Sequence, residues 1–251
     1  GRKGDEIIRG LADRMVEVDL LDQAAKLLRH QVDHRLKGAG RAQVAAKLAW
    51  VYLMNRKPSE AIVVLSRTRQ AVLPRDVSYQ RLLLEARALS ETGRTDLALD
   101  LLSSASGPEV DVLRADVLWK GREWQAAGEA IESGLNATWN DPEMLDADKR
   151  AMVLRGAISY ALADDRLGLQ RYRTKFLPKM ANSPDARAFD VVTMPLPENV
   201  GEFNELVSDV AAVDTLDAFL AEYRERYVLS PLPGADATPN GAAPEDATPR
   251  T

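Results

Sequence analysis

Residues 48–65 read LAWVYLMNRKPSEAIVVL, a pattern that recurs over much of the chain. Apolar residues follow helical spacing on both sides of the polar break NRKPS, which predicts two helices joined by a short turn. Related stretches are LADRMVEVDLLDQAAKLL at 11–28 and LEARALSETGRTDLALDLL at 84–102. Each has a small residue on its first helix, an alanine twelve residues later and a leucine four residues beyond: Ala12, Ala24 and Leu28; Ala49, Ala61 and Leu65; Ala86, Ala98 and Leu102.

The spacing between these units is regular. From Ala12 to Ala49 and from Ala49 to Ala86 the step is 37 residues. Helix pairs of this kind cannot bury their apolar faces alone and must stack on one another. Two looser pairs follow at 110–135 and 148–177, where the first-helix step changes to 29 and then 42 residues, and Leu169 replaces the second-helix alanine.

Over about residues 5–180 this pattern resembles the tetratricopeptide family, whose repeat is ~34 residues long. The resemblance implies an all-α, right-handed α-solenoid of tetratricopeptide-like helix pairs across residues 1–180. It also implies that the chain binds other proteins. The family's signature tryptophan and glycine of the first helix are missing, so a generic helical bundle or another two-helix solenoid remains an alternative.

The remainder forms a predicted C-terminal helical appendage over residues 181–228. Residues 181–199 contain three prolines, and we expect them to cross the end of the array in extended form. The stretches at 200–213 and 214–227 predict two closing helices, the second with Asp214 as its N-cap. Residues 229–251 are rich in proline and alanine and lack aromatic residues, which predicts a disordered tail.

Composition excludes several classes of protein. The 251 residues carry a net charge of −5 and no cysteine, so disulfides and thiolate chemistry are excluded, and no basic stripe indicates nucleic-acid binding. No apolar run reaches the ~20 residues that span a bilayer, so we expect no membrane insertion. The absence of cysteine and a start at Gly1 rather than Met lead us to favour a bacterial cell envelope over the cytoplasm.

The strongest candidate for chemistry is HQVDH at 30–34, which places His30 and His34 on one helical face. Two imidazoles at this spacing suit zinc, but catalytic zinc usually takes three protein ligands and no further histidine or cysteine exists. A solvated pair near a helix C-terminus is the alternative. Phosphate-binding loops and Ser-His-Asp arrangements are also missing. We therefore expect no enzymatic activity, metal or cofactor.

The family resemblance also implies a binding site. In the family, first-helix residues beside the packing positions line a concave groove, and the matching positions here are Lys47, Trp50, Leu83, Arg87, Trp119 and Arg155. The three cations favour an acidic or C-terminal peptide, although the asparagines of the family's carboxylate clamp are absent from these positions. The tryptophans could instead pack between repeats.

Two functions follow from this interpretation. The first is a non-catalytic scaffold that binds a peptide or protein segment in the groove. The second is a structural assembly module, the C-terminal part of a longer helical-repeat protein, whose groove is filled by its own residues 181–199. That segment is apolar enough to do so, through Phe189, Val191, Val192, Met194 and Leu196.

Overall fold

The computed structural model describes residues 2–136, 138–194 and 197–228. Within these ranges the chain is all-helical and contains no strand. No helix of the described part is long and apolar enough to cross a membrane. The α-helices are α1 (Arg2–Glu17), α2 (Leu21–His30), α3 (Gly38–Met54), α4 (Pro58–Arg67), α5 (Arg75–Glu91), α6 (Thr95–Leu102), α7 (Pro108–Lys120), α8 (Trp124–Gly134), α9 (Ala147–Leu162), α10 (Arg166–Met180), α11 (Ala186–Thr193), α12 (Val200–Ala212) and α13 (Thr215–Tyr223).

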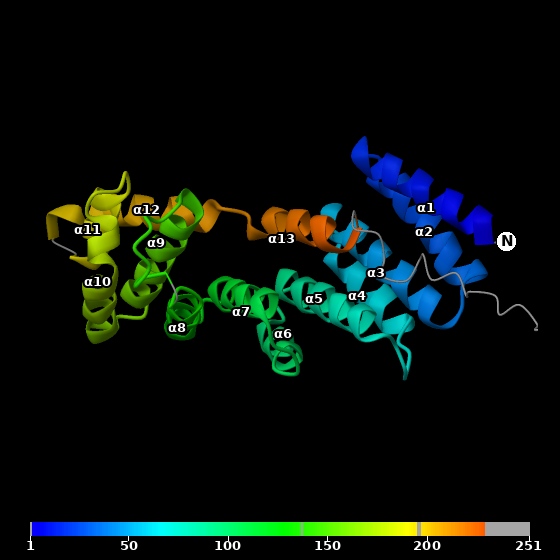
Figure 1. Cartoon of the computed structure of the whole chain (residues 1–251), viewed down its shortest axis with the longest axis horizontal. Coiled ribbons are helices and arrows are strands. Elements are labelled where there is room, and N and C mark those ends of the chain that lie inside the picture. The colour runs from blue at the N-terminus through cyan, green and yellow to red at the C-terminus, as the bar shows by residue number, and fades with distance from the viewer. Residues whose placement is uncertain (1, 137, 195–196, 229–251) are drawn as a thin grey trace, which may run out of the picture.

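Helices α1 to α10 form five consecutive pairs in an elongated array (Figure 1). Every pair has the same turn, in which the residue seven positions after the first-helix alanine has a positive φ of 54–75°. These residues are Asp19, Arg56, Gly93, Arg122 and Asp164. In each turn the next N–H donates a hydrogen bond to the carbonyl five residues earlier, at 2.7–3.1 Å. The shared turn fixes the register of the fourth and fifth pairs despite their irregular steps.

The alanines predicted to lie between helices are fully buried. Ala49, Ala61 and Ala98 have no exposed surface, and neither do the leucines that follow on the second helices. Ala127 and Ala157 continue this pattern in the fourth and fifth units, where they are also fully buried. A side chain of one carbon lets the helix backbones approach closely, so the prediction that these positions pack between helices is confirmed.

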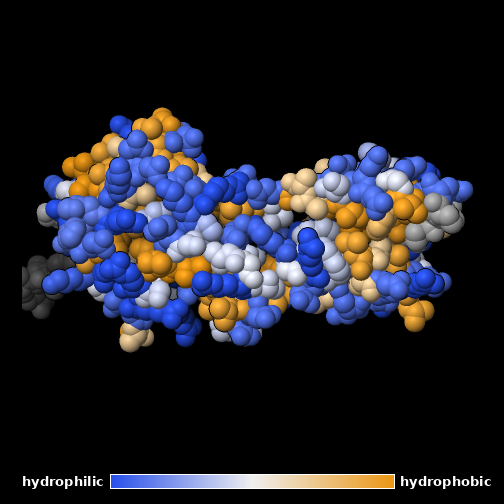
Figure 2. All heavy atoms as spheres, turned by 180° about the vertical axis from the view of Figure 1, so that it is seen from behind, coloured by the Kyte–Doolittle hydropathy of each residue, from blue (hydrophilic) through white to orange (hydrophobic). Residues whose placement is uncertain are grey.

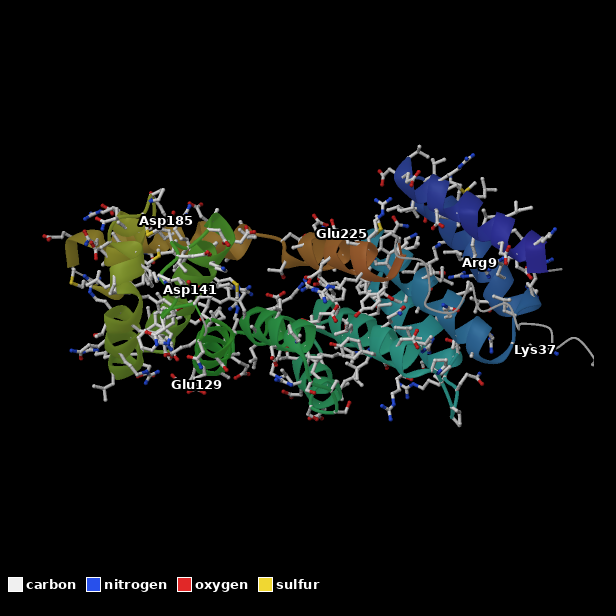
Figure 3. The ribbon with its side chains drawn as sticks, viewed as in Figure 1. Arg9, Lys37, Glu129, Asp141, Asp185 and Glu225 are labelled. Atoms are coloured by element: carbon white, nitrogen blue, oxygen red, sulfur yellow. The ribbon has the colours of Figure 1, made fainter. Side chains whose placement is uncertain are left out.

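Residues 181–199 are not extended as we expected. Helix α11 lies within this segment, and Phe189 and Val192 on one of its faces are buried in the core that includes α9 and α10. Arg150 of α9 also donates to Asp185, labelled in Figure 3, at 2.7 Å. Pro184 and Pro195 flank the helix and do not interrupt it, so the proline content misled the prediction.

Two closing helices are present, as predicted. Figure 1 shows α12 and α13 running back along one side of the array, from the α11 end towards α3. Helix α12 packs Phe203, Leu206, Val207 and Val210 against the core of the α9–α11 end. Figure 2 shows apolar surface gathered at both ends of the molecule. The predicted tail at 229–251 lies outside the described residues.

Candidate partner-binding face

The candidate site is the face formed by the first helices α3, α5 and α7, which we call the first-helix face. Helix α13 and the π-helical turn that follows it, η3 (Arg224–Val228), lie on this face. Leu216, Leu220 and Tyr223 share a core with α3 and are 2%, 5% and 4% exposed. Side chains fill the space between the α13 ribbon and the array in Figure 3. The array therefore binds an amphipathic helix of its own chain.

Polar contacts fix the depth and register of α13. The indole Nε1 of Trp50 donates to the Leu220 carbonyl at 3.2 Å, across 170 residues of sequence. The guanidinium of Arg87 donates to Thr215 Oγ1 at 3.0 Å. The two donor side chains are 1% and 2% exposed. The Trp50 hydrogen bond is buried, where an unmade bond is costly, and the Arg87 hydrogen bond is partly buried.

Further contacts hold the C-terminal end of the segment. The Tyr223 hydroxyl donates to Gln80 Oε1 at 3.4 Å, and the Tyr227 hydroxyl donates to both carboxylate oxygens of Glu109 at 2.8 and 3.0 Å. Burial, followed by the hydrogen bond to Glu109, raises the pKa of Tyr227 well above its usual range. The phenol therefore stays protonated and acts as the donor at neutral pH.

The N-terminal end of α13 is anchored by charge. Arg56, in the turn between α3 and α4, pairs with Asp214 at 2.7 Å and with Asp217 at 3.0 Å. The Asp214 side chain also accepts from the Leu216 N–H at 2.9 Å, which confirms the predicted N-cap. Burial alone raises the pKa of Asp214, but the hydrogen bonds from Leu216 and Arg56 outweigh it and the net pKa is lowered.

The cations predicted to attract an acidic ligand all have carboxylate partners. Arg87 pairs with Glu91 at 2.7 Å and with Asp116 at 3.5 Å. Arg155 pairs with the same Asp116 at 2.7 Å, and Lys47 pairs with Asp13. These carboxylates offset the three positive charges that were predicted to favour an acidic ligand. Glu91 lies one helical turn from Arg87 on α5, so this pair was open to prediction, whereas Asp13 and Asp116 come from neighbouring helices and were missed.

Trp119 lies at the edge of α13 rather than beneath it. Its ring stacks under the Arg155 guanidinium at 4.8 Å and meets the Trp124 ring edge-on at 5.1 Å. A hollow of about 400 Å³ opens here between the two tryptophans and the α12–α13 connection at 211–215. This hollow, with Trp119 and Trp124 in its lining, is one part of the first-helix side that α13 leaves accessible.

The six predicted residues lie on consecutive first helices along this side of the array, but α13 covers half of them. Trp50, Leu83 and Arg87 are buried beneath it, with Leu83 2% exposed. In the assembly-module alternative, residues 181–199 were to fill the groove. This part of the alternative is wrong, because the segment at 214–228 lies on the face and α11 packs on α9 and α10. A signal was available: Leu216, Phe219, Leu220 and Tyr223 have the helical spacing of an apolar stripe that needs a covering partner. Partner binding by the six residues stays a prediction.

The histidine pair is not part of this face. His30 is the last residue of α2 and His34 lies in the π-helical turn η1 (Gln31–Arg35) that follows, with ring centroids 5.1 Å apart. Among the residues described, no group of three or more His, Cys, Asp or Glu could hold a metal ion.

The fold and the face together define an all-helical array of paired helices that carries its own C-terminal helix. Comparison with protein-family models, curated proteins and solved structures finds no match for the chain.

Proposed function

We propose that the protein is a non-catalytic scaffold that binds a segment of a partner protein on the first-helix face. In this proposal the array is a right-handed solenoid of tetratricopeptide-like pairs, in keeping with the five identical turns and the buried alanines. The observation that supports this proposal most strongly is the docking of α13 on the first-helix face. An amphipathic helix lies on this face through an apolar stripe and through hydrogen bonds from Trp50 and Arg87, the arrangement of helix-in-groove recognition.

A structural assembly module is the second candidate, and one observation favours it. The face is filled by the chain's own segment, as that alternative requires, although by residues 214–228. In this case the contacts of α13 are permanent and partners bind elsewhere. The exposed apolar side chains of α1, Ile7 at 71% and Leu11 at 45%, are then the surface to which further helices would add.

Site-specific photo-cross-linking separates the two candidates. Trp119→p-benzoylphenylalanine places a reactive group beside the hollow at the edge of α13, and the same amino acid at Leu97, 54% exposed on α6, is the control. A scaffold should give a cross-linked partner at position 119 and none at 97. Purified partner should then re-form the product with the purified protein. Products at position 97 alone, or none at 119, would contradict the scaffold function.

A further inference from the structure

We propose that α13 is a displaceable occupant of the first-helix face. We further propose that the partner is a protein segment that folds there as an amphipathic helix of the same pattern. This inference rests on the proposed scaffold function and names its ligand class. The pattern is an acidic pair at the helix start, followed by apolar residues spaced as Leu216, Phe219, Leu220 and Tyr223. The chemistry of each position is set by the group that α13 meets.

The acidic pair is recognised by Arg56. This guanidinium is about half exposed, so it is reachable from solvent by an incoming helix that carries the same two carboxylates. Carboxylates at a helix start are also favoured by the helix dipole. The apolar stripe is recognised by the Trp50 and Leu83 surface, where aromatic and leucine side chains remove the most apolar area from water.

The fit of α13 to the face is incomplete. A hollow of about 200 Å³ remains between α13 and helices α5, α7 and α9, with Ala218 and Arg155 in its lining. One buried donor in this lining, Arg155 Nη2, has no hydrogen-bond partner within the described part of the chain. Unpaired buried donors and unfilled space both cost free energy. A helix with a longer, acceptor-bearing side chain at the Ala218 position would fit better than α13 does.

The covalent connection between α13 and α12 is short and exposed. Val213 and Asp214 alone join it to α12, and Val213 is 66% exposed. Helix α12 itself has no buried residue. A helix as short as α13 is marginal on its own, so it keeps its shape only while it is docked. Release of α13 therefore leaves the contacts among α1 to α10 in place.

Peptide binding to the full chain tests the proposal. The probe is a fluorescein-labelled peptide of residues 212–228 carrying Ala218→Gln, measured by fluorescence anisotropy. Wild type and the full-length Leu220→Asp variant are compared, and a peptide with Leu220→Asp is the control. The variant should bind the probe at least about tenfold more tightly than wild type, because its own α13 no longer competes. The native-sequence peptide should bind more weakly than the probe, and the control peptide should not bind.

Equal binding to both proteins, or no saturable binding to either, would overturn the proposal. Pairing of the segment with the face of a second copy would also overturn it, and sedimentation would reveal this as a concentration-dependent dimer of the wild type. The scaffold function would survive these results if Trp119 still cross-linked to a partner. If the peptide bound but Trp119 gave no partner, the face would be a helix receptor without the proposed cellular role.

A second measurement does not use the Leu220→Asp variant and so does not depend on whether that variant folds. The chain has no cysteine, so Leu220→Cys and Ala98→Cys each introduce a single thiol. The two side chains are 5% and 0% exposed, and both thiols are protected while the structure is closed. A displaceable α13 predicts that the thiol at 220 reacts at least about tenfold faster than the thiol at 98, as for local opening below the global unfolding free energy. Equal rates would show that α13 opens only with the array and would refute the proposal.

Discussion

Gly156→Ala is the change whose sign the structure determines most sharply. Gly156 lies inside α9, where alanine normally stabilises a helix over glycine by about 0.5–1 kcal/mol. A Cβ at this position would lie 2.3 Å from the hydroxyl oxygen of Tyr172 and 2.8 Å from its Cζ. Tyr172 has no exposed surface, and its hydroxyl donates to the Val153 carbonyl at 3.1 Å. The ring has no room to move without breaking that bond.

The unfavourable terms outweigh the gain in helix propensity. Overpacking a filled core costs about 1–3 kcal/mol, and a buried hydroxyl that loses its acceptor costs about 1–3 kcal/mol more. After the gain is subtracted, the free energy of unfolding should fall by about 1–5 kcal/mol. A loss of about 3 kcal/mol lowers the Tm of a chain of this size by roughly 6–12 °C.

Urea unfolding and thermal melting by circular dichroism measure this effect. Gly10→Ala in α1 is the matched control, because no atom lies within 4 Å of its added Cβ, and it should be neutral or stabilising. Adding Tyr172→Phe to Gly156→Ala removes the clashing oxygen, so the double variant should lose less stability than the sum of the single changes. Stabilisation by Gly156→Ala, of the size seen for Gly10→Ala, would refute the packing of α9 on α10.

Three further changes test other parts of the molecule. Ala98→Leu should lower the free energy of unfolding by about 1–3 kcal/mol in urea, because Ala98 is fully buried. Leu97→Ala, at an exposed position on the same helix, should change it little, and equal effects would contradict the repeat register. Trp50→Phe removes the donor to the Leu220 carbonyl and should cost about 1 kcal/mol, with faster labelling of a thiol at 220 as its signature. Burial raises the pKa of Glu132, but hydrogen bonds from Tyr160, Arg171 and Lys175 outweigh this effect, and the net pKa is lowered. The ionised carboxylate therefore stabilises the fold above its unfolded-state pKa, and this stabilisation is lost as the pH falls through the folded-state pKa. Glu132→Gln should therefore reduce stability near pH 7 and weaken the dependence on pH between about 5 and 3, and an unchanged acid profile would contradict this role.

The helix pairs could be predicted from the sequence because their packing is local. Each alanine on a first helix meets a second helix twelve residues away, so both partners fall within one short stretch. The same reasoning failed at 181–199, where Phe189 and Val192 form a helical face but the flanking prolines suggested extended chain. The same reasoning identified residues of the first-helix face but did not predict that α13 lies on it. Nothing local to Trp50 indicates Leu220, since that contact spans 170 residues.

The ion pairs of the first-helix face were harder to predict, because the type of a charged residue does not show which residue it pairs with. Arg87 and Arg155 suggested an acidic ligand, yet both share Asp116 on the helix that lies between them in the array. A buried cation without a partner would cost several kcal/mol, so some acid had to be close. This argument also constrains recognition. A ligand cannot gain much from cations that are already paired. Its affinity must come mainly from the apolar stripe and from the Arg155 donor left open beside Ala218. Shape and hydrogen bonding then select the partner. Arg56, which is about half exposed and pairs with Asp214 and Asp217, sets its direction.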